Sequence, residues 1–376
     1  MTRHYLDHAS TSPLRPAARD AMVRWLDHPI GDPGRIHAEG MTARVALEEA
    51  REAVAELLGA RSREVVFTSG ATESIATACL GVGARGAQQV VPAIEHSAVR
   101  ESAARAGAVA TIGVDEVGRV DPGALLDAIA PDTALVHLQW GNHEVGTVQP
   151  VAEVVAACRD RGVLVHVDAA QAVGRVPIDF RALGADLLSV SGHKLGGPPG
   201  TGALLVRRGL RLEPLLRGGD QERARRAGME NVAAIVGFGA AAAELSSPGR
   251  LEQEATEQRR LTDRVLAAVA ELDGVVVYGG TGTGRLPHLV CLGVAGIEPQ
   301  AVLLGLDRAG IAAHSGSACS TESLEPSPVL EAMGVDAHRS LRVSVGWDTA
   351  DEDIDALLRA LPEVIIDLRA LGGERR

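Results

Sequence analysis

The chain has 376 residues, 46% hydrophobic and 23% charged, which are usual values for a globular protein with a sizeable core and exclude wholesale disorder. Its formal net charge is −12, and it has only 3 Phe, 3 Trp and 2 Tyr, so we expect no direct recognition of DNA or RNA, which usually needs a basic face with stacking aromatic rings. No apolar run approaches the ~20 residues that span a bilayer, and the first ten residues lack the apolar stretch of a signal peptide. We therefore expect no membrane span and a cytoplasmic location.

From about residue 44 to 240, short apolar runs alternate with helical patterns. The runs predict strands at 64–69, 89–94, 108–114, 134–140, 163–168, 186–191 and 202–208. Several runs are continuous and rich in Val or Leu, as in a parallel sheet covered on both faces, and helical stretches such as 44–59 and 150–162 separate them. The alternation predicts right-handed crossovers and a large α/β domain with a doubly wound, mainly parallel seven-stranded sheet.

From about residue 250 the pattern changes. Residues 250–274 predict one long amphipathic helix that ends at Gly274. A strand, a Gly-rich turn, a second strand, a helix, a third strand and a closing helix follow, which together predict a smaller α+β domain. We place the large domain at residues 14–250 and the small domain at 1–13 and 251–376.

The chain contains a single lysine, Lys194, and its other basic residues are arginine. Arginine stays protonated and cannot act as an amine nucleophile, whereas a desolvated lysine can form a Schiff base. Lys194 is therefore either a residue that arginine cannot replace or a chance survivor on the surface, and the count alone leaves both open.

The motif FTSGATES at 67–74 predicts a strand end, a tight turn at Ser69-Gly70 and a helix that opens at Thr72. Exposed amides and a hydroxyl at a helix N-terminus can hold a phosphate, although an ordinary helix cap explains the hydroxyl equally well. By contrast, GVGARG at 81–86 matches the dinucleotide pattern GxGxxG but follows a helical pattern, so it predicts a Gly-rich turn.

Asp168 ends the strand at 163–168, and Lys194 follows the next strand, so both should lie at the edge of the sheet where α/β proteins bind ligands. His166 and Asp168 lack a third nearby ligand for a metal. A phosphate cradle, a strand-end Asp and a strand-end Lys are together what pyridoxal phosphate requires, since Lys carries the aldehyde and Asp keeps the pyridine nitrogen protonated.

Four cysteines are present, none in a CxxC pair. Cys79, Cys158 and Cys291 lie in apolar runs and are predicted core residues. Cys319 lies in a polar loop, HSGSACSTESLEPS at 314–327, before a helix that starts near Pro328. A loop thiol is a candidate nucleophile if a cation or helix end lowers its pKa, and otherwise an incidental thiol.

Longer stretches resemble one protein family. They are YLDHASTSP, FTSGATES, IEHSAV, VHVDAAQAVGRVPIDF, SGHKLGGPPGTGALLVRRG, LLRGGDQERARRAGMENVAAIVG, SGSACSTESLEPS and LRVSVG, in family order from residue 5 to about 346. The chain thus resembles the cysteine desulfurases of the pyridoxal-phosphate fold-type I, class V aminotransferase superfamily, in the class with a long cysteine-bearing loop.

The resemblance implies a role for each matching residue. Lys194 is similar to the Schiff-base lysine, Asp168 to the partner of the pyridine nitrogen and Gln171 to the donor to the ring's phenolic oxygen. His96 matches the imidazole stacked on the ring, which could also manage the thiol proton. Ala71, Thr72, Ser191 and His193 match the phosphate-binding positions, Arg342 matches the clamp for the substrate carboxylate, and Cys319 matches the nucleophile that takes up sulfur.

The implied activity converts L-cysteine to L-alanine and leaves the sulfur as a persulfide on Cys319, for transfer to an acceptor protein. The implied assembly is a homodimer, and no metal is expected. A related lyase acting on C–S or C–Se bonds, a transaminase in which Cys319 is incidental, and a non-catalytic assembly partner remain as alternatives.

Several positions depart from the family pattern. His143 stands where the family's Asn reaches the phenolic oxygen, and Met229 stands where a Thr serves the partner subunit's phosphate. Asp220 and Ala76 replace a His and an Asn, and Ser10-Thr11-Ser12-Pro13 replaces ATTP. These departures bear on cofactor affinity and substrate choice, and they leave Lys194, Asp168, Arg342 and Cys319 untouched.

Overall fold

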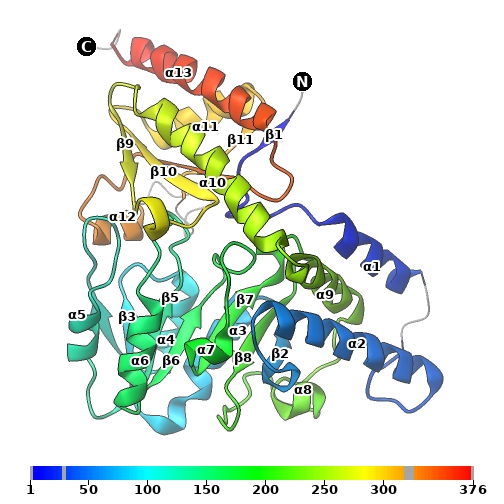
Figure 1. Cartoon of the computed structure of the whole chain (residues 1–376). Helices are drawn as coiled ribbons and strands as arrows, with labels where there is room; N and C mark the ends of the chain where they lie inside the picture. The colour runs from blue at the N-terminus through cyan, green and yellow to red at the C-terminus, as the bar shows by residue number, and fades with distance from the viewer. Residues whose placement is uncertain (1–2, 28–30, 317–325, 374–376) are drawn as a thin grey trace.

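The computed structural model describes residues 3–27, 31–316 and 326–373, and its largest element is a seven-stranded sheet (Figure 1). The strands, in their order across the sheet, are β2 (Val65–Thr68), β8 (Gly202–Val206), β7 (Leu187–Ser191), β6 (Leu164–Asp168), β5 (Thr133–Gln139), β3 (Gln88–Pro92) and β4 (Ala108–Ile112). Neighbouring strands are parallel except at β8, which is antiparallel to both β7 and β2. The predicted mainly parallel sheet is therefore confirmed, and each strand overlaps one predicted run.

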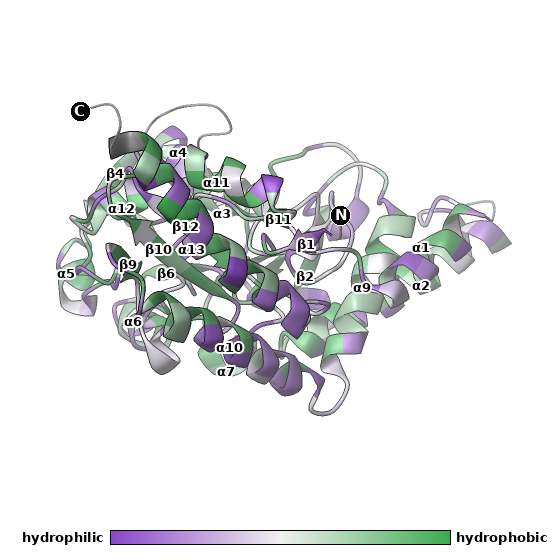
Figure 2. Cartoon of the chain, turned by 90° about the horizontal axis from the view of Figure 1, so that it is seen from above, coloured by the Kyte–Doolittle hydropathy of each residue, from purple (hydrophilic) through white to green (hydrophobic). Residues whose placement is uncertain are grey.

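Most of the sheet is buried, whereas the edge strand β4 is largely exposed. Every residue of β2, β6, β7 and β8 is buried, as their continuous apolar runs predicted. The helices of this part are α1 (Pro16–Leu26), α2 (Ala38–Leu57), α3 (Ala71–Gly81), α4 (Ser97–Ala106), α5 (Pro122–Asp127), α6 (Val151–Asp160), α7 (Phe180–Leu183), α8 (Gln221–Ala224) and α9 (Val232–Ser246). Seen from above, α1, α2 and α9 group at one end of the molecule, away from α5 and α6 (Figure 2).

The C-terminal part contains a smaller antiparallel sheet. Its strand order is β12 (Ser340–Ser344), β10 (Leu289–Val294), β9 (Val275–Tyr278). The other elements are α10 (Arg250–Val269), α11 (Pro299–Arg308), β11 (Ile311–Ala312), α12 (Pro328–Ala332) and α13 (Asp351–Gly373). β1 (His4–Tyr5) pairs with β11, so the N-terminal strand joins this part. α10 leads into it from the end of α9 (Figure 1).

The two largest groups of buried apolar side chains are separate. One surrounds the large sheet and includes Phe67, Val167 and Phe238, whereas the other includes Leu6 and Leu357. This separation supports the domain division at residue 250, which stays a prediction.

Two smaller predictions are also resolved. Cys79, Cys158 and Cys291 are buried free thiols, as expected of core residues. Gly83–Arg85 form a short 3-10 turn after α3, so the GxGxxG match is a Gly-rich turn.

Within the described ranges, no single helix is long and apolar enough to cross a membrane. Only α9 and α10 taken together pass that test of length and composition, across a bend of 82°.

A buried ion pair holds a turn of unusual backbone conformation in α8. Glu222, Arg223 and Ala224 have φ angles of 48°, 60° and 60°, a left-handed region that costs roughly 1–2 kcal/mol per residue outside glycine. The Glu222 carboxylate accepts two 2.7 Å hydrogen bonds from the Arg51 guanidinium and a 2.8 Å bond from the Phe67 amide. These contacts tie the turn to α2 and β2.

We predict that Arg51→Met lowers the free energy of unfolding by about 3–5 kcal/mol, because it leaves the buried Glu222 carboxylate without its cation. The control is Arg223→Met, which removes the partly exposed Arg223–Glu48 pair and should cost at most about 1 kcal/mol. Guanidinium denaturation of both variants measures the difference. Equal losses would show that the Arg51–Glu222 pair does not hold the turn.

Candidate active site

A cavity of about 540 Å³ opens where β5, β6 and β7 end and α3 begins. Ten of the predicted site residues line it: Ala71, Thr72, His96, His143, Asp168, Gln171, Ser191, His193, Lys194 and Arg342. Ala9 and Ser10 of the N-terminal segment and His314 and Gly316 of the C-terminal part complete the wall. Cys319, the remaining predicted residue, lies outside the described residues.

Lys194 enters the cavity from a short 3-10 turn, Gly192–Lys194, that directly follows β7. Its Nζ donates hydrogen bonds to the carbonyl oxygens of Ala9 at 2.6 Å and Ser10 at 2.8 Å. Burial lowers the pKa of Lys194 to about 7, and the Arg342 charge adds to that effect against the opposing charges of Asp7 and Asp168. Near neutral pH the amine is thus available as a nucleophile and as a base.

Asp168 ends β6 and is 8% exposed. Its Oδ1 accepts a 2.9 Å hydrogen bond from the Ala170 amide. Burial raises the pKa of Asp168, while this amide and the charges of His143 and Lys194 lower it. A carboxylate in this position favours a cationic or hydrogen-bond-donating group in the cavity, as a protonated pyridine nitrogen would be.

The start of α3 forms the opposite end of the cavity. Gly70 has a φ of 151°, and a Cβ built on it would lie 3.9 Å from Ser191 Oγ, so a side chain there would fill the space between these two elements. Ala71 and Thr72 form the first turn of this 11-residue helix and also line the cavity. Helix amides and a hydroxyl at such an end favour an anionic group, which a phosphate supplies.

His193 lies beside this cradle. Its Nδ1 is 3.1 Å from Thr11 Oγ1, within hydrogen-bond distance. Burial lowers the pKa of His193 to about 4, and the Lys194 charge contributes, so the ring is neutral near pH 7.

His96 and His143 face each other across the cavity wall, with ring centroids 5.1 Å apart in an edge-to-face arrangement. The Ala98 amide donates to His96 Nδ1 at 3.1 Å, which caps α4 and leaves the proton of the neutral ring on Nε2. Burial lowers the pKa of His96 to about 3, and the charges of His143 and Lys194 add to this effect. His96 is therefore a neutral imidazole under physiological conditions.

Gln171 is held at both ends of its side-chain amide. Nε2 donates to the Ala9 carbonyl at 2.8 Å, and Oε1 is 3.1 Å from His288 Nε2. Because an amide nitrogen has two hydrogens, this arrangement leaves a second donor for a ligand oxygen.

Arg342 lies on β12 and reaches the cavity from the C-terminal part. Its Nη1 donates to the His143 carbonyl at 2.8 Å, and its Nη2 donates to Asp7 Oδ1 at 2.9 Å and to Ser10 Oγ at 2.7 Å. These bonds fix the guanidinium at the wall, where a substrate carboxylate can approach it.

The sequence matches the family described as Aminotransferase class-V over residues 4–357. A cysteine desulfurase of Gluconacetobacter diazotrophicus is 43% identical, covering 99% of this chain and 95% of the relative. Among solved structures, a NifS-like protein superposes with a TM-score of 0.90 at 30% identity, covering 98% of this chain and 100% of that one. A second structure, SspA in complex with cysteine, gives a TM-score of 0.79 at 28% identity and covers 91% and 98% of the two chains.

The chain belongs to the class-V aminotransferase family. The resemblance that the sequence motifs indicated is thereby confirmed.

Two residues beside the site of this class-V aminotransferase were not predicted from the sequence. Asp7 pairs with Arg342, which is 335 residues away, so no local motif could reveal the contact. Glu95 is buried, and its Oε1 accepts a 2.6 Å hydrogen bond from the backbone amide of Gln139. Gln139 ends β5 and pairs with Asp168 on the neighbouring strand β6. Burial, and to a lesser degree the Asp168 charge, raise the pKa of Glu95 well above its usual value.

We predict that an amine-reactive reagent labels Lys194 of the cofactor-free protein at a rate that rises with pH through about 7, because only the neutral amine reacts. Arg342→Gln should move this midpoint up and Asp7→Asn should move it down, since the two charges act on the pKa of Lys194 with opposite signs. Peptide mapping separates Lys194 from the N-terminal amine, the internal control. A midpoint near the ordinary lysine pKa of about 10.4 would show that burial does not lower the pKa of Lys194.

Proposed function

We propose that this class-V aminotransferase is a pyridoxal-phosphate-dependent cysteine desulfurase that converts L-cysteine to L-alanine. The observation that carries the proposal is the meeting of the chain's only lysine, at lowered pKa, with Asp168 and Arg342 in one cavity. The names of its relatives support the same activity and favour it over a C–S or C–Se lyase of other specificity or a transaminase.

The residues present fit the cofactor. Lys194 would hold its aldehyde carbon, Asp168 its pyridine nitrogen and Gln171 its phenolic oxygen. His143 lines the same cavity and would be a second contact for the phenolic oxygen. The phosphate would lie at the start of α3, between Thr72, Ser191 and His193. When bound, pyridoxal phosphate supplies an electron sink that weakens the bonds at the substrate's Cα.

Three side chains of the cavity would bind the substrate and transfer its protons. Arg342 binds the substrate carboxylate through a guanidinium that Asp7 and Ser10 already orient. Lys194, with a pKa near 7, takes and returns the Cα proton. His96, neutral and with its Nε2 proton free of the α4 cap, can exchange a proton with the substrate thiol.

Sulfur is captured by Cys319. The described chain reaches Gly316 at the cavity wall, three residues before this cysteine, which supports its access to the substrate. The Cys319 thiolate attacks the substrate Sγ, the Sγ–Cβ bond breaks, and Cβ gains a proton to give alanine. The persulfide on Cys319 then passes its outer sulfur to a thiol of an acceptor protein.

The homodimer, the acceptor protein and the cytoplasmic location belong to the proposal. Met229, Leu215 and Leu216 are exposed apolar residues of one segment, with Met229 56% exposed, which supports contact of this segment with a second copy.

We expect Lys194→Ala to abolish alanine formation, because the chain has no second lysine to replace it. Borohydride reduction of the wild-type holoenzyme, followed by peptide mapping, should place the cofactor on Lys194. Arg207→Gln, on an exposed ion pair with Asp186, is the control and should keep both activity and attachment. Cofactor found only on the N-terminal amine would overturn the assignment.

Cys319→Ser should keep bound cofactor and a change of its absorbance on addition of cysteine, yet release little sulfur to a thiol acceptor. The reason is that Lys194 acts at Cα and Asp168 at the pyridine nitrogen, whereas Cys319 acts only on the substrate sulfur. Absorbance spectra and sulfide assays under single-turnover conditions measure the two parts separately. Full turnover in this variant would instead support a lyase or a transaminase in which Cys319 is incidental.

A further inference from the structure

Four successive backbone carbonyls at the catalytic lysine receive hydrogen bonds from distant residues. The Ser12 amide donates to His193 O at 2.9 Å, and the Ser12 hydroxyl donates to Lys194 O at 3.1 Å. Arg15 donates to the next two carbonyls, from Nε to Leu195 O and from its amide to Gly196 O, both at 2.8 Å. Arg175 Nη2 adds a second bond to Lys194 O at 3.1 Å.

The same N-terminal segment therefore holds both ends of Lys194. Ala9 and Ser10 accept hydrogen bonds from the amine, while Ser12 and Arg15 bind the backbone. Any shift of this segment must move the lysine with it.

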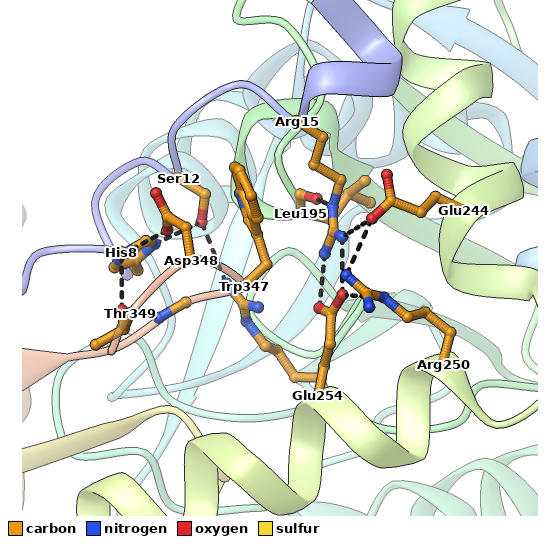
Figure 3. Close-up of polar contacts among 12 residues, drawn as sticks. His8, Ser12, Arg15, Leu195, Glu244, Arg250, Glu254, Trp347, Asp348 and Thr349 are labelled. Atoms are coloured by element: carbon orange, nitrogen blue, oxygen red, sulfur yellow. Dashed lines mark hydrogen bonds and ion pairs between the residues drawn. The ribbon is translucent and has the colours of Figure 1, made fainter. Parts of the chain in front are cut away.

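Arg15 joins this segment to the helix that leads into the C-terminal part. Its guanidinium is fully buried and lies between α9 and α10, as Figure 3 shows. Nη1 and Nη2 form a two-pronged contact with Glu254 of α10 at 2.8 Å and 2.7 Å, and Nη1 also bonds to Glu244 of α9 at 2.7 Å. Every nitrogen of the guanidinium thus has a partner, and one of these partners is the carbonyl next to Lys194.

The packing around Arg15 leaves little freedom. Gly196 has a φ of +85°, and a Cβ on it would lie 2.6 Å from Arg15 Cγ and 3.1 Å from Trp347 Nε1. Trp347 Nε1 donates to the Pro13 carbonyl at 3.0 Å, and its ring centroid is 5.5 Å from Arg15 Cζ. Trp347 follows β12, the strand that carries Arg342.

We propose that Arg15 is a positioning residue that fixes the backbone of Lys194 relative to α10 and the strand of Arg342. The role rests on the proposed function of Lys194 as the residue that captures pyridoxal phosphate. Arg15 is not one of the residues that line the cavity, and its side chain reaches the Lys194 turn through the Leu195 carbonyl.

A matched control is available because Arg250 binds the same two carboxylates. Arg250 Nη2 lies 3.2 Å from Glu244 Oε1, and its Nε lies 2.8 Å from Glu254 Oε1. It is partly exposed, and its ion pairs connect it only to α9 and α10 (Figure 3). Arg15→Gln and Arg250→Gln therefore remove the same charge from the same cluster, but only the first removes a hydrogen bond to the Leu195 carbonyl, next to Lys194.

The experiment follows three quantities in wild type, Arg15→Gln and Arg250→Gln. These are the thermal unfolding midpoint, the pH midpoint for labelling Lys194 in cofactor-free protein, and the rate at which Lys194 captures added pyridoxal phosphate. Both variants should unfold at lower temperature. Only Arg15→Gln should move the labelling midpoint upward, because a displaced Lys194 amine is better hydrated. Only Arg15→Gln should also slow the capture of pyridoxal phosphate, by about 10- to 100-fold for a displacement near 1 Å.

Arg15→Gln leaves the buried Glu254 carboxylate with Arg250 as its remaining ion-pair partner, so the double variant Arg15→Gln/Glu254→Gln is measured beside it to separate the effect of that charge. It removes the Glu254 charge that Arg15 no longer balances, while the Leu195 carbonyl still lacks its donor, so it should retain the altered labelling midpoint and the slow capture.

Equal labelling midpoints and capture rates in the Arg15 and Arg250 variants would overturn the positioning role and make Arg15 a purely structural ion pair. A wild-type protein that captures no pyridoxal phosphate would instead contradict the proposed function. The two failures are therefore distinguishable.

Discussion

The structure depends on keeping one amine out of water. Lys194 lies in a cavity where burial lowers its pKa to about 7, and the carbonyl oxygens of Ala9 and Ser10 hold its nitrogen. An arginine would stay protonated and could not act as an amine nucleophile, which is consistent with a lysine at this position in an otherwise lysine-free chain. Of the surrounding charges, Arg342 lowers the pKa of the amine further, whereas Asp7 and Asp168 raise it.

This environment requires segments that are far apart in the sequence to meet. The large sheet supplies Asp168 and Lys194, the N-terminal segment supplies the carbonyls that bind the amine, and β12 supplies Arg342. Asp7 joins the last two by pairing with Arg342 at 2.9 Å. Because β1 pairs with β11, the N-terminal segment is anchored in the C-terminal part before it reaches the cavity. The active site is therefore also the junction between the two buried cores.

The sequence predicted the parts of this structure that depend on local pattern. Most of the seven strands were predictable because buried strands are continuous apolar runs. Asp168 and Lys194 were predictable because the first ends such a run and the second closely follows one. α9 gave no amphipathic period, since ten of its residues, mostly Ala, Val and Gly, are buried on all sides. The contacts of Arg15 with Glu244 and Glu254, which are 229 and 239 residues away, have no local signal, so only the structure could reveal them.

We propose that one chain separates chemistry at Cα, carried out by Lys194, from sulfur capture by Cys319. The most direct measurement is a single turnover of the holoenzyme with isotopically labelled cysteine and no acceptor, followed by mass spectrometry of its peptides and assay of alanine. We expect one labelled sulfur atom on the peptide that contains Cys319 for each alanine formed. Alanine without sulfur on that peptide, or labelled sulfur on Cys79, Cys158 or Cys291 instead, would contradict it.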